Sequence, residues 1–123
     1  MKVVYMDVEN NKLPKVMDIE DKLEVFYELI GCRCIDIVRR KIGNKRYDVI
    51  CDDEGLFKDD PVVSAVDTKY GDRLVGNLII CKSDVEGNLM GLSDNDVEEI
   101  IRHIKVYFTQ DFEKICPVLQ MTY

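Results

Sequence analysis

The amino-acid sequence predicts an α+β fold, in which a short antiparallel or mixed sheet of about five strands carries two helices on one face. Three observations lead to this prediction. Two segments place apolar residues at helical spacing, several short runs are rich in β-branched and aromatic residues, and turn residues separate these runs. The 123 residues fit a single domain, residues 1–123, with enough chain for one hydrophobic core.

The chain opens with two predicted strands. Residues Lys2 to Val8 have the β-branched and aromatic content that is typical of a strand. A polar turn cluster from Glu9 to Lys12 follows, and residues Pro14 to Asp18 are expected to return as a second strand. Because proline lacks an N–H group, Pro14 must begin that strand or lie on a sheet edge.

The first helix is predicted from Ile19 to Ile30. Its apolar residues recur at helical spacing and therefore share one face: Ile19, Leu23, Phe26, Tyr27 and Ile30. Asp18 is the expected N-cap of this helix. Gly31 can adopt the left-handed conformation that ends a helix.

A hairpin and a central strand come next. The segments Cys34 to Lys41 and Arg46 to Asp52 flank a Gly-Asn turn, which is typical of a β-hairpin. Residues 56–72 match no element clearly. Residues Leu74 to Lys82 are predicted as one strand that is apolar on both faces and therefore central in the sheet. Gly76 within it is expected to mark a bulge or a close backbone approach.

A short strand from Leu89 to Leu92 is predicted to precede the second helix. Ser93 and Asp96 have the spacing of a capping box, which places the start of the helix at Ser93. Apolar residues at helical spacing extend the prediction to Phe108: Val97, Ile100, Ile101, Ile104 and Phe108.

The second predicted helix is followed by a C-terminal extension, residues 109–123. The extension contains an apolar run from Ile115 to Leu119. We expect it either to pair as an edge strand or to pack on a neighbouring subunit, which would make the protein a homo-oligomer.

Charge and cysteine content restrict the class of protein. The chain has 17 basic and 24 acidic side chains and a net charge of −7. Phosphate backbones repel such a chain, so general nucleic-acid binding is not expected, although an acidic chain could mimic nucleic acid. No segment has the roughly 20 apolar residues of a membrane helix. The five cysteines are odd in number and lie mostly in apolar runs, which predicts reduced thiols and a cytoplasmic location.

No catalytic residue, cofactor or metal site is predicted. The one histidine, His103, has no identifiable nucleophile or orienting carboxylate. Cys32 and Cys34 are separated by one residue, less than in common zinc or redox pairs. Motifs for a phosphate loop, a calcium loop or a nucleophile elbow are missing. A binding function is therefore favoured, with an unrecognised hydrolase or transferase as an alternative.

Basic residues surround the predicted hairpin tip, followed by a tyrosine: Arg39, Arg40, Lys41, Lys45, Arg46 and Tyr47. Together the cations could hold a phosphate or a small nucleotide, with Tyr47 stacking on the base. The alternative is a solvated hairpin end, where cations prevent edge-to-edge aggregation of strands.

Several short segments have a specific order and spacing along the chain: Lys2-Val3-Val4, Ile19 to Leu23, Leu29-Ile30-Gly31, Ile50 to Gly55, Val75 to Ile80, and Leu92 to Val97. In this order they make the chain, up to about Phe108, resemble a family of domains of unknown function from phages, plasmids and conjugative elements. The stretch Leu56 to Pro61 departs from the leucine-rich pattern of that family. For any ligand, the resemblance implies these positions: Asp53, Glu54, Gly55, Gly76 and Asn77. Turn and bulge geometry is the alternative explanation for them.

The resemblance also implies a role, because domains of this family occur alongside antirestriction modules. We therefore expect a non-enzymatic accessory protein of a phage or mobile element that acts against host defence. It would bind a host defence protein or sequester the small nucleotide signal of that system. The alternative is a regulatory or scaffolding module with no defence role.

Overall fold

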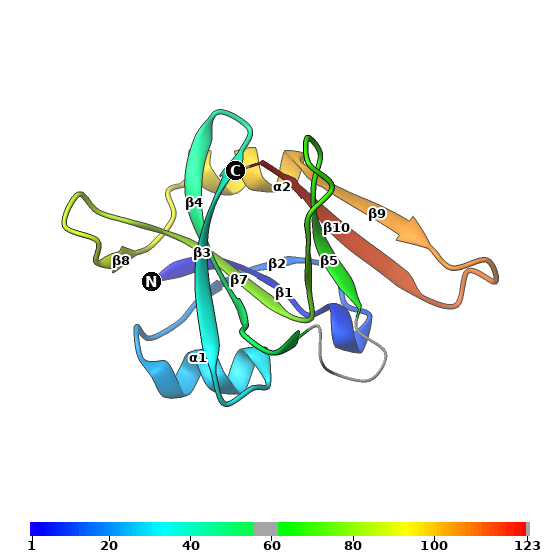
Figure 1. The fold of residues 1–123 in the computed structure, drawn as a ribbon, viewed down its shortest axis with the longest axis horizontal. Coiled ribbons are helices and arrows are strands. Elements are labelled where there is room, and N and C mark those ends of the chain that lie inside the picture. The colour runs from blue at the N-terminus through cyan, green and yellow to red at the C-terminus, as the bar shows by residue number, and fades with distance from the viewer. Residues whose placement is uncertain (56–61, 123) are drawn as a thin grey trace.

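The computed structural model describes residues 1–55 and 62–122 and shows two sheets rather than one (Figure 1). The first sheet has six strands in the order β2-β1-β7-β4-β3, with β8 added beside β7, and the second has four in the order β6-β5-β10-β9. The predicted single sheet of about five strands is therefore wrong. The stretch 56–61, which departs from the family pattern, lies outside the described residues.

The elements have the following bounds. The first sheet consists of β1 (Lys2–Met6), β2 (Lys15–Asp18), β3 (Ile35–Ile42), β4 (Lys45–Asp52), β7 (Leu78–Ser83) and β8 (Leu89–Met90). The second consists of β5 (Val63–Asp67), β6 (Arg73–Val75), β9 (Ile104–Phe108) and β10 (Ile115–Met121). The helices that lie wholly within the described residues are a 3-10 turn η1 (Val8–Asn10), α1 (Leu23–Ile30) and α2 (Asp94–Arg102). Strands pair antiparallel throughout, except for the parallel pair β5 and β10.

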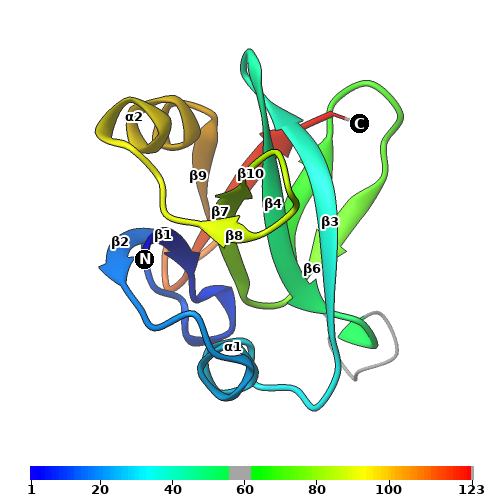
Figure 2. The same ribbon diagram turned by 90° about the vertical axis from the view of Figure 1, so that its left-hand side faces the viewer.

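The two helices lie on opposite sides of the six-stranded sheet, as Figures 1 and 2 show. Side chains alternate between the faces of a strand. In β1, Val3 and Tyr5 therefore pack with α1, in a cluster that includes Phe26. Val4 points the other way, into a cluster that includes Ile100 of α2. The expectation of two helices on one face is wrong, because β1, β4 and β7 have apolar residues on both faces.

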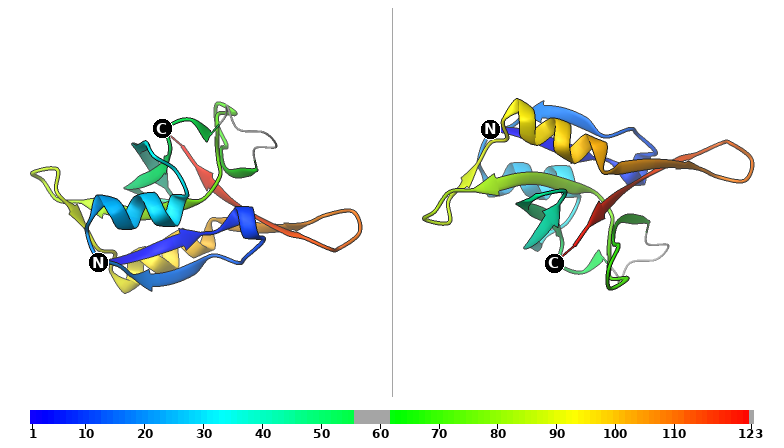
Figure 3. Two further views of the ribbon diagram at one scale, coloured as in Figure 1. Left: turned by 90° about the horizontal axis from the view of Figure 1, so that it is seen from below. Right: turned by 90° about the horizontal axis from the view of Figure 1, so that it is seen from above.

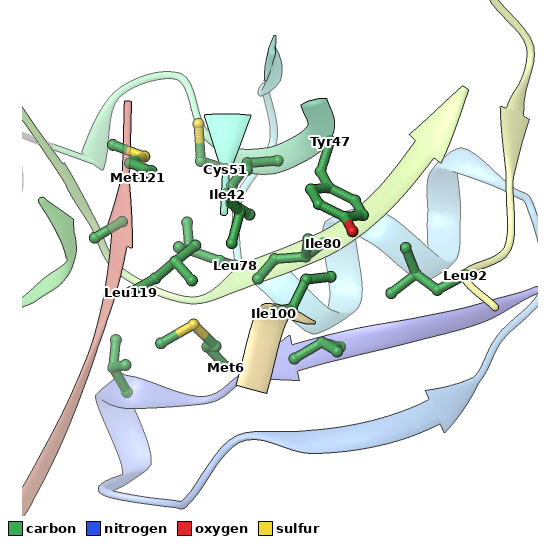
Figure 4. Close-up of a cluster of buried hydrophobic side chains, with 14 residues drawn as sticks. Met6, Ile42, Tyr47, Cys51, Leu78, Ile80, Leu92, Ile100, Leu119 and Met121 are labelled. Atoms are coloured by element: carbon green, nitrogen blue, oxygen red, sulfur yellow. The ribbon is translucent and has the colours of Figure 1, made fainter. Parts of the chain in front are cut away.

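The larger core lies between the two sheets and α2 (Figure 4). Its side chains come from both sheets, from α2 and from the segment before α2: Met6, Ile42, Tyr47, Cys51, Leu78, Ile80, Leu92, Ile100, Leu119 and Met121. At one corner the sheets join directly, because the backbones of Lys41 and Thr122 exchange hydrogen bonds of 2.6 and 2.8 Å. Burial of this core is the main apolar contribution to folding.

The predicted strand from Leu74 to Lys82 is two strands that belong to different sheets. β6 ends at Val75 and β7 begins at Leu78, so the chain passes from one sheet to the other at Gly76 and Asn77. Gly76 has a φ of +80°, a conformation that glycine adopts without strain. The apolar run is therefore continuous in sequence but serves two sheets.

The first helix is shorter than predicted. It begins at Leu23 with Lys22 as N-cap, and it ends at Gly31, which has a φ of +76°. Asp18 is the last residue of β2, and its carboxylate accepts a 2.6 Å hydrogen bond from the N-terminal amine. Ile19 is buried, but its backbone N–H donates to Met1, so helical spacing here reflects burial and not helical backbone.

The second helix also ends early, at Arg102, although its capping box of Ser93 and Asp96 is confirmed. The residues that were expected to extend it, Ile104–Phe108, form β9 and pair with β10. β-Branched and aromatic residues suit a strand, and a paired neighbour decides between two readings of a short apolar segment. The C-terminal segment is thus the strand β10, paired with β5 and β9 on its two sides, and not an edge strand.

None of the helices in the described parts of the chain is long and apolar enough to cross a membrane.

Candidate functional site

The cations of the β3–β4 hairpin do not converge on one site. Arg39, Lys41 and Arg46 lie on one face of the hairpin and Arg40 and Lys45 on the other, because side chains alternate along a strand and directly opposite residues share a face. Arg39 donates to Asp48 at 3.4 Å and to the Ser83 hydroxyl at 2.9 Å. The predicted phosphate-binding set is thus divided between two faces of the hairpin, and Arg39 is held by its neighbours.

Lys45 and Tyr47 belong to a polar cluster under α2 whose centre is the buried carboxylate of Asp96. The carboxylate of Asp96 accepts hydrogen bonds from Lys82 at 2.6 Å and from Lys45 at 3.2 Å. The Tyr47 hydroxyl lies 3.3 Å from Asp96 and donates to Glu99 at 2.8 Å. The Tyr47 ring is 1 % exposed, so it does not stack on a ligand as the sequence suggested.

Electrostatics in this cluster favour a charged aspartate and a neutral tyrosine. Burial opposes the charge on Asp96, but hydrogen bonds from Lys82 and Ser93 outweigh it and hold the pKa of this carboxyl far below its usual range. Burial, followed by the hydrogen bond to Glu99, raises the pKa of Tyr47. The cluster therefore fastens α2 to the hairpin and to β7, which is a structural role.

The turn after β4 contributes to a small pocket between the sheets. Asp53 and Gly55 line a space of about 160 Å³, together with residues of β3, β4 and β6: Asp36, Val38, Cys51, Asp52, Arg73, Leu74 and Val75. A Cβ atom on Gly55 would lie 2.9 Å from a methyl group of Val75, so the turn packs closely on β6. Glu54 is exposed beside the pocket. Burial raises the pKa of the Cys51 thiol to about 12, so this thiol is not an activated nucleophile.

The other two positions implied by the resemblance, Gly76 and Asn77, support the fold. The Asn77 amide donates to the Tyr5 hydroxyl and to the Leu29 carbonyl, both at 3.3 Å, and accepts from the Glu9 N–H at 3.1 Å. Asn77 thus joins β1, η1 and α1 where the chain changes sheets. Of the five implied positions, Asp53 and Gly55 line the pocket, whereas Glu54, Gly76 and Asn77 do not.

His103 is the C-cap of α2, and its Nδ1 lies 2.8 Å from the Glu99 carbonyl oxygen. Among the residues that the structure describes, no group of three or more histidine, cysteine or acidic side chains is arranged to hold a metal ion.

The sequence did not reveal an exposed apolar feature of the described residues. β9, the turn after it and the first part of β10 form a hairpin arm (residues 104–118) that projects from the body of the domain (Figures 1 and 3). Four side chains of this arm are 40–80 % exposed: Val106, Tyr107, Phe108 and Phe112. The rings of Phe108 and Phe112 pack at a centroid distance of 6.1 Å.

An apolar groove lies at the base of the arm. It has a volume of about 220 Å³ and is lined by Leu13, Pro14, Ile101, Ile104 and Val106. Leu13 and Ile101 are 56 % and 42 % exposed. Soluble proteins rarely expose contiguous apolar surface without a binding role. The arm and the groove together are therefore the candidate binding surface.

Backbone hydrogen bonds show which groups β9 presents to solvent. The His103 carbonyl accepts from Gln120 and the Thr109 N–H donates to Lys114, so odd-numbered residues of this segment bond to β10. In an antiparallel pair alternate residues direct their N–H and C=O groups to opposite sides. The backbone groups of Ile104, Val106 and Phe108 consequently point away from β10. No strand in the described ranges, 1–55 and 62–122, pairs with this outer edge.

Comparison with known proteins gives a family and no function. No curated protein and no solved structure matches the chain. A family model described as a domain of unknown function, DUF3846, matches residues 1–105.

Proposed function

We propose that this chain, which belongs to the DUF3846 family, acts by binding another protein, whose extended strand adds to the outer edge of β9. The observation that carries the proposal is the combination of a free strand edge with an exposed apolar face. Strand addition uses main-chain hydrogen bonds for affinity and pockets for alternate side chains for specificity. The outer edge of β9 offers main-chain groups for such hydrogen bonds. The apolar groove can receive side chains from one face of the added strand.

The other sheet edges are protected in ways that β9 is not. At β2, Lys15 is exposed and Asp18 binds the N-terminal amine. β3 has four charged side chains among its eight residues and is bridged by Thr122 at Lys41, and β6 has three residues. Charge, covering and short length are the usual means of preventing edge pairing. β9 has five residues with one charged side chain, and this contrast supports a binding role for its edge.

Site-specific photo-crosslinking in living cells tests the proposal. A photoreactive amino acid at Phe108 is expected to form protein adducts, and the same group at Val85, a fully exposed residue of the β7–β8 turn, is expected to form none. Adding Val106→Pro to the Phe108 probe removes an outward N–H group and should abolish the adducts. Equal labelling from Phe108 and Val85, or adducts that persist with proline, would contradict strand addition. The mass of each adduct identifies the partner.

The partner in a counter-defence role would be a host defence protein, and that role stays a prediction. Plating phages on a panel of defended hosts that express the chain tests it. The expected result is restored plating on at least one host, lost with Val106→Pro. Unchanged plating on every host would contradict the role while leaving strand addition untouched.

A further inference from the structure

We infer that the strand that adds to β9 is β9 of a second copy of this chain, related to the first by a two-fold axis at Val106. The inference rests on the proposed function, and it names the partner of the same edge. The paired sheets would form one continuous sheet through β10, β9, β9 and β10. Two-fold pairing requires a strand whose backbone and side chains complement themselves.

The backbone of β9 meets this requirement. An antiparallel two-fold axis at Val106 sets Val106 opposite itself and Ile104 opposite Phe108 of the second copy. These are the three residues whose N–H and C=O groups point outward from β10. Each such pair exchanges two bonds, which gives about six hydrogen bonds across the axis. This register is the one that pairs all five residues of β9.

The side chains also fit this register. Lys105 falls opposite Tyr107 of the second copy, so the single charge of the strand faces an aromatic ring and not another lysine. A parallel arrangement in register would set the two lysines side by side, and like charges directly opposite one another destabilise a sheet. The charge pattern therefore selects the antiparallel pair.

The groove supplies the third element of the fit. Directly opposite residues lie on the same face of a sheet, so Phe108 of one copy lies beside Ile104 of the other. Ile104 lines the apolar groove with Leu13, Pro14 and Ile101. Phe108, which is 60 % exposed in the single chain, can enter this groove in the pair. The aromatic side chain and its receiving surface are both present on each copy, at the positions that the two-fold axis brings together.

Charge substitution at the axis tests the inference, because a residue on a two-fold axis faces its own copy. The mass of the purified protein in solution is measured by light scattering after size exclusion. Wild type is expected to have twice the mass of one chain. Val106→Lys and Val106→Glu are each expected to halve that mass, since like charges would meet at the axis. An equimolar mixture of the two variants is expected to restore the doubled mass.

Val16→Lys is the matched control, since Val16 is an exposed valine on the edge strand β2 of the other sheet. This variant is expected to keep the mass of wild type. Circular dichroism confirms that each variant is folded. A wild-type mass of one chain would overturn the inference, and so would a doubled mass that persists in Val106→Lys or a mixture that stays monomeric. In those cases, adducts from Phe108 to a different protein would still support strand addition.

Discussion

Val106 lies directly opposite Pro117 in the ladder between β9 and β10, and a proline has no N–H to donate to it. The pair sits where the two strands make no hydrogen bond to each other, so the ladder loses nothing by having proline there. Pro117 also precedes the part of β10 that pairs with β5, which begins at Leu119. Hydrogen-bonded and non-hydrogen-bonded pairs alternate along the ladder, so Pro117 removes no bond from it. For the same reason the N–H and C=O groups of Val106 point away from β10.

The loss of stability caused by a proline in β9 is expected to depend on whether the replaced N–H points towards β10 or away from it. Val106→Pro removes an N–H that points away from β10 and bonds to no group among the described residues, so the free energy of unfolding should fall by about 1 kcal/mol or less. Lys105→Pro removes an N–H that bonds to β10 and should lower it by about 1–3 kcal/mol. Urea denaturation, at a protein concentration low enough to keep the wild type and both variants monomeric, measures both values. Equal losses at the two positions would contradict the assigned hydrogen-bond pattern.

Loss of the charge on Asp96 is expected to destabilise the domain. Asp96→Asn leaves Lys82, whose side chain is 29 % exposed, without its anionic partner at 2.6 Å. We expect the free energy of unfolding to fall by about 2 kcal/mol, because a partly buried cation is left uncompensated. Asp94→Asn is the control: Asp94 also pairs with a lysine, at 2.7 Å, but its side chain is exposed, and we expect no measurable change.

The contribution of the Asp96 carboxylate to the stability of the fold should also depend on pH. Its pKa is lower in the folded protein than the ordinary value of 3.8, so the carboxylate stabilises the fold above that value. This contribution is lost as the pH falls below 3.8 towards the pKa of the folded state. The difference in stability between wild type and Asp96→Asn is therefore expected to shrink in acid. A difference that stays constant from neutral to acidic pH would contradict the assignment.

The five free cysteines provide a test of the core. Cys34 is exposed, whereas Cys51 and Cys81 are buried and burial raises the pKa of each thiol to about 12. A thiol reagent is expected to label Cys34 in the native protein and to reach Cys51 and Cys81 only after unfolding. Mass spectrometry of the labelled peptides gives the order in which the cysteines react. Early labelling of Cys81 would show that the β7 region is open.

Removal of the C-terminal residues 111–123 is expected to unfold the second sheet, and the pairing surface of β9 should be lost with it. β10 lies between β5 and β9, and Leu119 is fully buried in the main core. The truncated chain should show reduced β content by circular dichroism and no cooperative thermal transition. A truncated chain that folds with native stability would mean that β10 is dispensable.

Local signals in the sequence predicted some elements well. The Gly-Asn turn fixed the β3–β4 hairpin, since Gly43 has a φ of +64°. The spacing of Ser93 and Asp96 located the start of α2 through its capping box. These predictions succeeded because each depends on residues that are close in sequence and that satisfy one another directly.

Predictions that depended on distant partners failed. Ile104 and Phe108 lie at helical spacing from Ile100, yet pairing with β10 makes their segment a strand. The segment Leu74 to Lys82 is divided between two sheets because β6 pairs with β5 and β7 pairs with β1 and β4. No local pattern in the sequence reveals these partners. The candidate binding surface was missed for the same reason. Phe108 is exposed because β9 pairs with β10 at the edge of the second sheet, and this pairing joins residues that no local pattern connects.

The central claim is that the outer edge of β9 is a binding surface, and residue-resolved hydrogen exchange tests it most directly. At high protein concentration, the amides of Ile104, Val106 and Phe108 are expected to be protected along with those of Lys105 and Tyr107. In Val106→Lys, protection should remain at positions 105 and 107 and be lost at positions 104 and 108. Free exchange at 104, 106 and 108 in wild type, at every concentration and with every partner that crosslinking identifies, would contradict the claim.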